Sequence, residues 1–335
     1  MTRIALMGFG RLGRNIFRIL MEREDFTLAA ISDIADHGGL EYLLRYDTIL
    51  GRVPHEVSLK EGHLYTLGKQ NDMLSGKDPG DVNWRDYDVD VVIDATARSR
   101  SRSEHLKHIE AGAKKVLLLS PPADEPDKTV IMGLNHDDVT HDDKIISNSS
   151  ITAHCAAPII KSIHTAFGIE RLFLTSVHAY TNDQRLADVP SSDLRTSRAA
   201  GENIIPAQTG TAQVLEDLFP ELNGKISALA LKVPVPNGSL VDMVTFTQKP
   251  VTKTAINEVV RTSAHDLYPD LIEYTDDPIV SSDVKSSPYS STFDALATQV
   301  LDDSLVKTVS WFDNGWGYAH RAIDLVAHLA SKGAL

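Results

Sequence analysis

The sequence predicts an α/β protein in two parts, a doubly wound parallel sheet followed by an α+β part with a mixed or antiparallel sheet. Three observations lead to this prediction. The chain has 335 residues, more than the roughly 250–300 at which one hydrophobic core stops growing. Short apolar runs alternate with helical patterns in the first half, as in a parallel sheet. Longer β-rich runs with polar alternation fill the second half, which suits antiparallel pairing.

The elements of the first half follow one another in a regular order. Residues 3–8, RIALMG, form an apolar run typical of a buried strand, and residues 11–22 form a helical pattern with Leu12, Ile16, Ile19 and Leu20 on one face. The same reasoning predicts strands over 26–33, 90–96 and 114–120, and a helix over 101–113 that ends at Gly112.

The second half changes in style near residue 150, which is the only boundary signal along the chain. Long strands are predicted over 170–181, 224–236 and 239–248. Amphipathic helices are predicted over 252–267 and 316–332.

Composition excludes several classes of partner. The net charge of −13 repels nucleic acid and anionic membrane, although it leaves room for a small basic pocket that binds an anionic substrate. The single cysteine, Cys155, cannot form an intrachain disulfide and indicates a reducing compartment. No apolar run reaches the ~18 residues of a membrane span, and the start of the chain lacks a signal-peptide layout. We therefore expect a cytoplasmic protein.

A glycine-rich turn near the start of the chain indicates a dinucleotide site. Gly8, Gly10 and Gly13 form G-x-G-x-x-G between a predicted strand and a predicted helix, and Asp33 ends the next strand 20 residues later. This context is typical of a Rossmann domain, in which the glycines admit a pyrophosphate and the carboxylate binds the adenosine ribose. Asp33 would repel a 2′-phosphate and Ile34 offers it no charge, so NAD is favoured over NADP.

Longer motifs make the chain resemble the phosphorylating glyceraldehyde-3-phosphate dehydrogenases over nearly its full length. They include MGFGRLGRNIFR, LLRYDTILGR, SVHAYTNDQ, ENIIPAQTG, FPELNGKISALALKVPVPN and WFDNGWGYAHR, in the order of the family. The resemblance implies an NAD-binding Rossmann domain over residues 1–149, with the C-terminal helix 316–335 packed back on it. It also implies a catalytic domain over residues 150–315 and a homotetramer.

The resemblance assigns roles to individual residues. It makes His178, in HAYT, the general base, and it associates Pro190 with NAD preference. The implied cofactor contacts are Gly8, Phe9, Gly10, Arg11, Leu12, Gly13, Asp33, Thr96, Ser120 and Asn314. The implied substrate and phosphate contacts are Ser150, Thr152, Thr181, Asp183, Thr209, Gly210 and Lys232.

The chain departs from the family pattern at the residue that carries the covalent chemistry. Ile151 occupies the position of the family's nucleophilic cysteine. Other departures lie at Ala153 and His154 in the same motif, at Lys232 and Gln213 where the family has an arginine and a lysine, and in the segment ATARSR, which contains Ala97 and Arg100 beside the cofactor region.

Loss of the thiol removes the family's covalent route, because isoleucine has no lone pair with which to attack an aldehyde. Cys155 lies one helical turn after Ile151 in the apolar stripe Ile151, Cys155, Ile159 and Ile163, so we expect a buried core thiol. His154 has two readings, a replacement acid, base or metal ligand, or a partly exposed histidine near a phosphate site, and we favour the second. The motif lacks a second ligand at metal-binding spacing, so no metal is expected.

Three hypotheses about function stay open at this point. The first is an NAD-dependent oxidoreductase that acts without a covalent thioester on a small phosphorylated sugar or similar carbonyl or alcohol, with His178 as acid and base. The second is a catalytically silent NAD-binding paralogue with a regulatory role, including hetero-oligomers with an active relative. The third is a working phosphorylating dehydrogenase, which rests on the resemblance alone.

Overall fold

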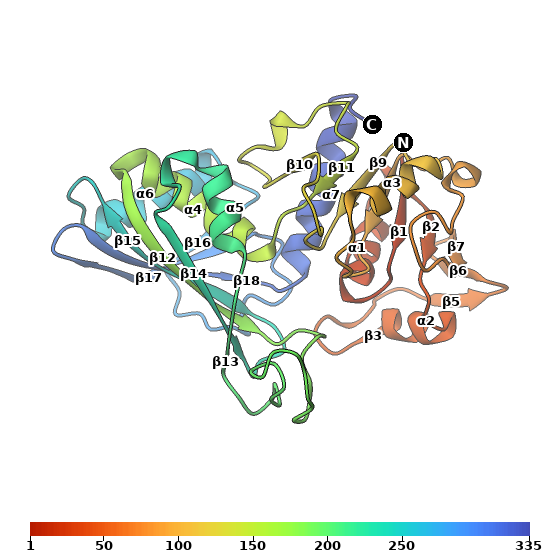
Figure 1. Cartoon of the computed structure of the whole chain (residues 1–335), viewed down its shortest axis with the longest axis horizontal. Helices are drawn as coiled ribbons and strands as arrows, with labels where there is room; N and C mark the ends of the chain where they lie inside the picture. Colours follow the sequence, from red (N-terminus) through yellow and green to blue (C-terminus); the bar gives the residue numbers. More distant parts are fainter. The chain divides into compact units, whose positions relative to one another are not determined.

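The computed structural model describes all 335 residues, which form two compact units. The first unit contains residues 1–150 and 319–335, and the second contains residues 151–318 (Figure 1). Both units combine helices and strands, so the predicted α/β fold class is confirmed. No helix in the chain has the length and apolar character needed to cross a membrane.

The first unit is built on a nine-stranded sheet whose centre is parallel. The strands lie in the order β10 (Lys128–Thr129), β11 (Ile145–Ser147), β9 (Lys115–Leu118), β8 (Val91–Asp94), β1 (Thr2–Met7), β2 (Phe26–Ser32), β7 (Lys69–Leu74), β6 (His63–Thr66) and β5 (Val57–Lys60). All neighbours from β10 to β7 pair in parallel. The order reverses direction at β1, between β8 and β2, as a doubly wound sheet requires.

One edge of this sheet is antiparallel, which the sequence reasoning did not anticipate. β5, β6 and β7 pair as successive hairpins. Their two connections place Glu61 and Gly62 at φ 51° and 81°, and Leu67 and Gly68 at φ 47° and 74°. Two successive residues with positive φ form the type I′ turn that matches the twist of a hairpin. The turns contain only one glycine each, so the usual sequence signal was weak.

The helices of the first unit are α1 (Arg11–Met21), α2 (His37–Arg45), α3 (Arg102–Glu110) and the part of α7 (Trp316–Ser331) from residue 319 onward. α1 buries Ile16, Phe17, Ile19 and Leu20, close to the predicted face. The rings of Phe9 and Phe17 meet edge to face with their centroids 5.5 Å apart. This packing fixes the turn between β1 and α1, because Phe9 lies within it.

The second unit is built on a seven-stranded mixed sheet. Its order is β13 (Ile205–Ala207), β14 (Ile226–Val233), β12 (Ile169–Ala179), β15 (Ser239–Thr247), β18 (Leu305–Phe312), β17 (Ser291–Leu301) and β16 (Ile272–Thr275). β12 pairs in parallel with β14 and in antiparallel with β15. The helices α4 (Ile151–Phe167), α5 (Thr211–Leu218) and α6 (Lys253–Asp266) pack on one face of the sheet (Figure 1). α4, between the other two helices, supplies much of the core under this face.

Candidate functional site

The glycine turn of the first unit has the shape of an anion cradle. Gly8 adopts φ +95°, and a Cβ there would lie 2.7 Å from the carbonyl carbon of Ala95. A Cβ on Gly13 would overlap the carbonyl oxygen of Gly8, whereas one on Gly10 would meet nothing within 4 Å. No side chain caps the start of α1. Gly8 and Gly13 are therefore needed because no side chain fits at either position. Gly10 leaves open space at the amino terminus of α1, where a pyrophosphate fits.

Asp33 is held in place at the end of β2. Its Oδ2 accepts a hydrogen bond of 2.6 Å from the backbone N–H of Phe9, and its Oδ1 accepts one of 2.9 Å from the N–H of Ala35. The next side chain, Ile34, is 61% exposed and brings no positive charge. The turn and the carboxylate are therefore linked directly, and they fit the pyrophosphate and the adenosine ribose of NAD.

The other predicted cofactor residues of this unit also lie at the carboxyl edge of the parallel strands. Arg11 and Leu12 begin α1, Thr96 follows β8, and Ser120 follows β9. Thr96 donates both its N–H, at 3.0 Å, and its hydroxyl, at 2.6 Å, to Oδ1 of the buried Asp94. This edge is where open α/β sheets bind their ligands.

His178 is the centre of the polar group in the second unit. It lies on β12 directly opposite Lys232 on β14 in the parallel register. Its Nδ1 is 2.7 Å from the carbonyl oxygen of Ala179, 3.2 Å from Nδ2 of Asn314 and 3.4 Å from Nζ of Lys232. The carbonyl of Ala179 is the closest of the three and can only accept, so we assign the ring proton to Nδ1 and the lone pair to Nε2. The Asn314 and Lys232 nitrogens, which only donate, are then neighbours of Nδ1 and not its hydrogen-bond donors.

Asn314 is fixed by a buried network. Its Oδ1 accepts a hydrogen bond of 2.7 Å from the hydroxyl of Ser239, and its N–H donates at 2.8 Å to Oδ1 of Asn237. Asn237 in turn donates to Asp313 at 2.6 Å, and Asp313 accepts from the N–H groups of Gly315 and Trp316 at the start of α7. The amide of Asn314 is therefore held in one orientation beside His178.

The surroundings of His178 keep it neutral. Burial lowers the pKa of its imidazole to about 4, and the nearby Lys232 ammonium adds to the effect. Burial also lowers the pKa of Lys232, against an opposing influence of the Asp183 carboxylate. The neutral imidazole of His178 can therefore accept a proton from a substrate. Burial and the Lys232 ammonium disfavour the resulting imidazolium, so the ring should release that proton readily.

The predicted nucleophile position offers no thiol. Ile151 is the partly exposed first residue of α4, and Cys155 one turn later is completely buried. The Cys155 sulfur lies 3.6 Å from the hydroxyl of Ser291 and 3.8 Å from the carbonyl oxygen of Ser310. Burial raises the pKa of this thiol to about 12. Cys155 is thus a core residue, as its place in the stripe with Ile159 and Ile163 predicts.

His154 corrects one expectation. We favoured a partly exposed histidine, but its side chain is only 2% exposed. Its ring meets that of Tyr318 edge to face, with centroids 5.8 Å apart. Every residue of α4 from Thr152 to Ile160 is buried, so this part of the helix is enclosed on all sides and position 154 has no face toward solvent.

The predicted phosphate residues are brought together only in part. Thr181 joins the His178 group, because its hydroxyl lies 3.5 Å from Nζ of Lys232. Thr209 contacts the hydroxyl of Thr211 at 2.8 Å, and Gly210 precedes the uncapped start of α5. Asp183 is exposed after β12, and its carboxylate acts on the pKa values of both His178 and Lys232. Thr152 is buried in the first turn of α4, and Ser150 directly precedes that helix.

Two features of these sites could not be read from the sequence. The His178–Lys232 pair depends on which strands become neighbours, and nothing in either segment specifies that. Arg100 lies buried against Asp94 beside Thr96, although an arginine in a polar loop is usually exposed.

One further group has ligand types suited to a metal. Atoms of His136, Asp137 and His328 lie within 4.8 Å of one another in the first unit. However, Asp137 already pairs with Nζ of Lys332 at 3.1 Å, and Nδ1 of His136 accepts the N–H of Gly133 at 3.2 Å. A metal-bound histidine needs an acceptor, not a donor, at its second nitrogen, so we assign no metal to this group.

Family models and curated relatives match nearly the whole chain. A family model described as the NAD binding domain of glyceraldehyde 3-phosphate dehydrogenase matches residues 2–102, and one described as its C-terminal domain matches residues 150–314. Glyceraldehyde-3-phosphate dehydrogenase of Geobacillus stearothermophilus is 43% identical over 99% of both chains. The enzyme of that name from Mycobacterium leprae is 43% identical over 97% of both. The chain therefore belongs to the glyceraldehyde-3-phosphate dehydrogenase family and is an NAD-binding member of it.

Proposed function

We propose that this protein is an NAD-dependent oxidoreductase that interconverts an alcohol and a carbonyl in a small phosphorylated sugar or similar compound, without a covalent thioester. The observation that carries the proposal is the neutral His178 held beside Lys232 and Asn314, in a chain that has no thiol at position 151. A general base needs no nucleophile to remove a hydroxyl proton.

The chemistry assigned to these residues balances. In the oxidising direction Nε2 of His178 accepts the proton of the substrate hydroxyl, and the carbon–oxygen double bond forms as the hydride leaves the same carbon. NAD, when bound, supplies the hydride acceptor. The positive charge of Lys232, 3.4 Å from the ring, opposes imidazolium and favours release of the proton to solvent. In reverse, His178 returns the proton to the carbonyl oxygen.

Lys232 and Thr181 are the residues to which we assign the substrate phosphate, with Asp183, Ser150, Thr152, Thr209 and Gly210 as further predicted contacts. Support comes from the 3.5 Å contact between Lys232 and Thr181. A lysine binds phosphate as a point charge and lacks the two-pronged grip of arginine. The phosphate should therefore be held less tightly than in relatives with arginine at this position.

Turnover of sugar phosphates and of their alcohols, followed by NADH formation or consumption, tests the proposal. We expect steady turnover with at least one compound, and a fall in kcat of about 10²–10⁴-fold in His178→Asn. His265→Asn is the matched control, since that histidine is 88% exposed on α6. Lys232→Met should raise KM for the phosphorylated compound more than for its unphosphorylated analogue. Equal activity of His178→Asn and the unchanged protein would contradict the assigned base.

The second candidate is a catalytically silent NAD-binding paralogue with a regulatory or partner-binding role. Ile151 and the fully buried Cys155 favour it, because they remove the family's covalent route. NAD binding without turnover on any compound would support this candidate. A shift in the kinetics of an active family member after the two chains are refolded together would then identify a hetero-oligomer.

Assembly and location remain predictions. We propose a homotetramer, and the exposed apolar side chains of Phe173, Leu186, Leu194 and Leu229 support association of the second unit. A cytoplasmic location is predicted from the single cysteine and its reducing compartment.

A further inference from the structure

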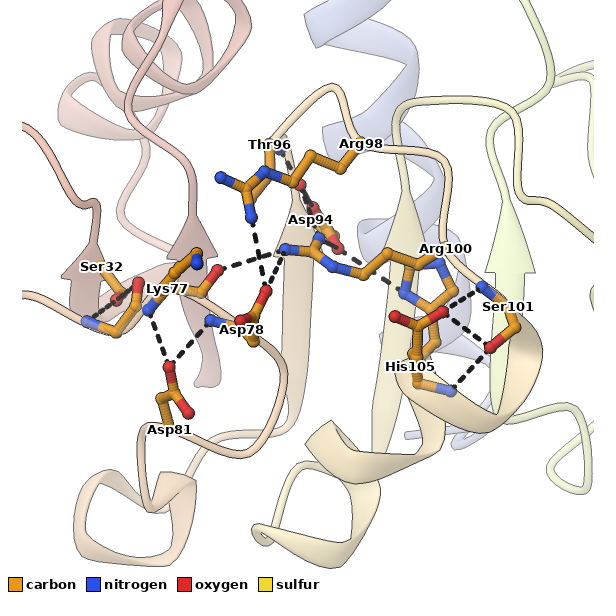
Figure 2. Close-up of polar contacts among 12 residues, drawn as sticks. Ser32, Lys77, Asp78, Asp81, Asp94, Thr96, Arg98, Arg100, Ser101 and His105 are labelled. Carbon is orange, nitrogen blue, oxygen red and sulfur yellow. Dashed lines mark hydrogen bonds and ion pairs between the residues drawn. The ribbon is translucent and has the colours of Figure 1, made fainter.

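Arg100 is a buried cation at the carboxyl edge of the first unit's sheet. Its side chain is 4% exposed. Nη1 lies 3.2 Å from Oδ2 of Asp94 and 2.8 Å from the hydroxyl of Thr96. Nη2 lies 3.2 Å from the carbonyl oxygen of Lys77 and 3.4 Å from Oδ1 of Asp78. Figure 2 shows the guanidinium between these two sets of partners, so one side chain joins the segment after β7 to the segment after β8.

These two segments belong to strands that are not neighbours. The sheet order β8-β1-β2-β7 separates them by three strand intervals, about 14 Å at the usual spacing. β1 and β2 lie between these two strands, and the glycine turn and Asp33 follow their carboxyl ends. The contacts of Arg100 therefore connect the segments that flank the glycine turn and Asp33 on either side.

Each tied segment also touches a cofactor-binding group. A Cβ on Gly8 would lie 2.8 Å from the backbone nitrogen of Thr96, so the turn packs directly on the segment after β8. On the other side, the hydroxyl of Ser32, which precedes Asp33, contacts the N–H of Gly76 at 3.0 Å and its carbonyl oxygen at 3.1 Å (Figure 2). A shift of either segment would displace the groups that face the adenosine half of NAD.

The charges explain why an arginine is needed. Asp94 is 1% exposed, and its other close basic neighbour is Nδ1 of His105 at 3.6 Å. Burial lowers the pKa of His105, so Arg100 is the permanent counter-charge of this carboxylate. A lysine would keep the charge but could not reach Asp94 and the segment at Lys77 and Asp78 at once, since it lacks the planar fork.

We propose that Arg100 is a positioning residue for NAD, which holds residues 75–78 and 94–96 at the separation in which Asp33, Thr96 and the glycine turn bind the adenosine half of the cofactor. This role rests on NAD binding by the first unit and is independent of the chemistry proposed for His178. Loss of turnover with normal NAD affinity would thus affect only the proposed function.

Calorimetric titration of the full chain with NAD and with ADP-ribose tests the role, because the two ligands share the adenosine half. A misplacement of about 1 Å can cost up to about 100-fold, and we expect Arg100→Met to weaken both ligands by about tenfold with the binding stoichiometry unchanged. Arg100→Lys should fail to restore affinity. A lower stoichiometry with unchanged affinity would show a purely structural role and overturn the proposal.

Two further variants keep the test decisive. Arg102→Met is the matched control, because Arg102 lies two residues after Arg100 and pairs instead with Asp127. The affinity of this variant for both ligands should be unchanged. Asp78→Asn removes the charge from one end of the tie and leaves the bond from Arg100 to the carbonyl of Lys77 in place. The Asp78 side chain is 52% exposed and its other ion pair is with Arg98, so the protein should fold even if Arg100→Met does not. We expect about threefold weaker binding from this loss of a half-exposed ion pair. Unchanged affinity in both Asp78→Asn and Arg100→Lys would also overturn the proposal.

Discussion

The reactivity of the Cys155 thiol provides a direct test of the hypothesis that this chain does not form a covalent thioester. Cys155 is completely buried and its pKa is raised to about 12. An ordinary thiol of pKa about 8.5 is roughly one quarter ionised at pH 8, whereas one of pKa about 12 is ionised to about one part in 10⁴. Because the thiolate is the reacting species, alkylation of Cys155 should be at least about 10³-fold slower than that of a free cysteine.

Ile151→Cys places a thiol at the position that the resemblance assigns to the family's nucleophile. Position 151 is the partly exposed first residue of α4, and a helix amino terminus stabilises a thiolate. With iodoacetamide at pH 8, we expect one equivalent to react rapidly in this variant and none on the same timescale in the unchanged protein. Ile151→Ser is the control for changes in packing, and it should be labelled as slowly as the unchanged protein.

A rapid-mixing experiment then decides whether Cys155 has any catalytic part. Glyceraldehyde 3-phosphate, NAD and phosphate should yield no stoichiometric burst of NADH from the unchanged protein. Ile151→Cys should gain at most faint turnover, since Lys232 still lacks the arginine fork. A burst in the unchanged protein that disappears in Cys155→Ala would refute the reasoning and make Cys155 the nucleophile.

Three other outcomes are expected. The pKa of His178, about 4, lies below its ordinary value of 6.5, so between these values the unfolded chain binds the proton that the folded chain excludes. The unfolding free energy should therefore fall as the pH drops from about 6.5 to about 4, and denaturant titrations should show a smaller fall in His178→Asn. Asp33 should make NAD bind at least several-fold more tightly than NADP, by like-charge repulsion. Calorimetry should find this difference narrowed in Asp33→Ala, and equal affinities in the unchanged protein would contradict it. Light scattering should give a tetramer, with the loop from Asp188 to Ala200 crossing an interface, and a monomer at micromolar concentration would contradict this.

The elements with a strong periodic pattern could be predicted from the sequence. The strand expected over residues 170–181 is β12, and the helix expected over 252–267 is α6, each within two residues at either end. These segments carry their own signal, because the spacing of apolar residues differs between strand and helix. The hairpin edge β5–β6–β7 was missed, since Glu61 and Leu67 adopt positive φ without being glycine or asparagine.

The sequence by itself determined the family, through motifs in order along nearly the whole chain. It also determined the glycine-turn motif with Asp33 and the absence of a thiol at position 151, because these depend on residues close together in the chain. Only the tertiary structure decided that Lys232 lies beside His178, that His154 turns into the core, and that Arg100 ties two distant loops through Asp94. Contacts of this second kind depend on which strands pair and which helix face packs inward. The burial that lowers the pKa of His178 and raises that of Cys155 arises in the same way, since desolvation is a property of the assembled core and not of any local segment.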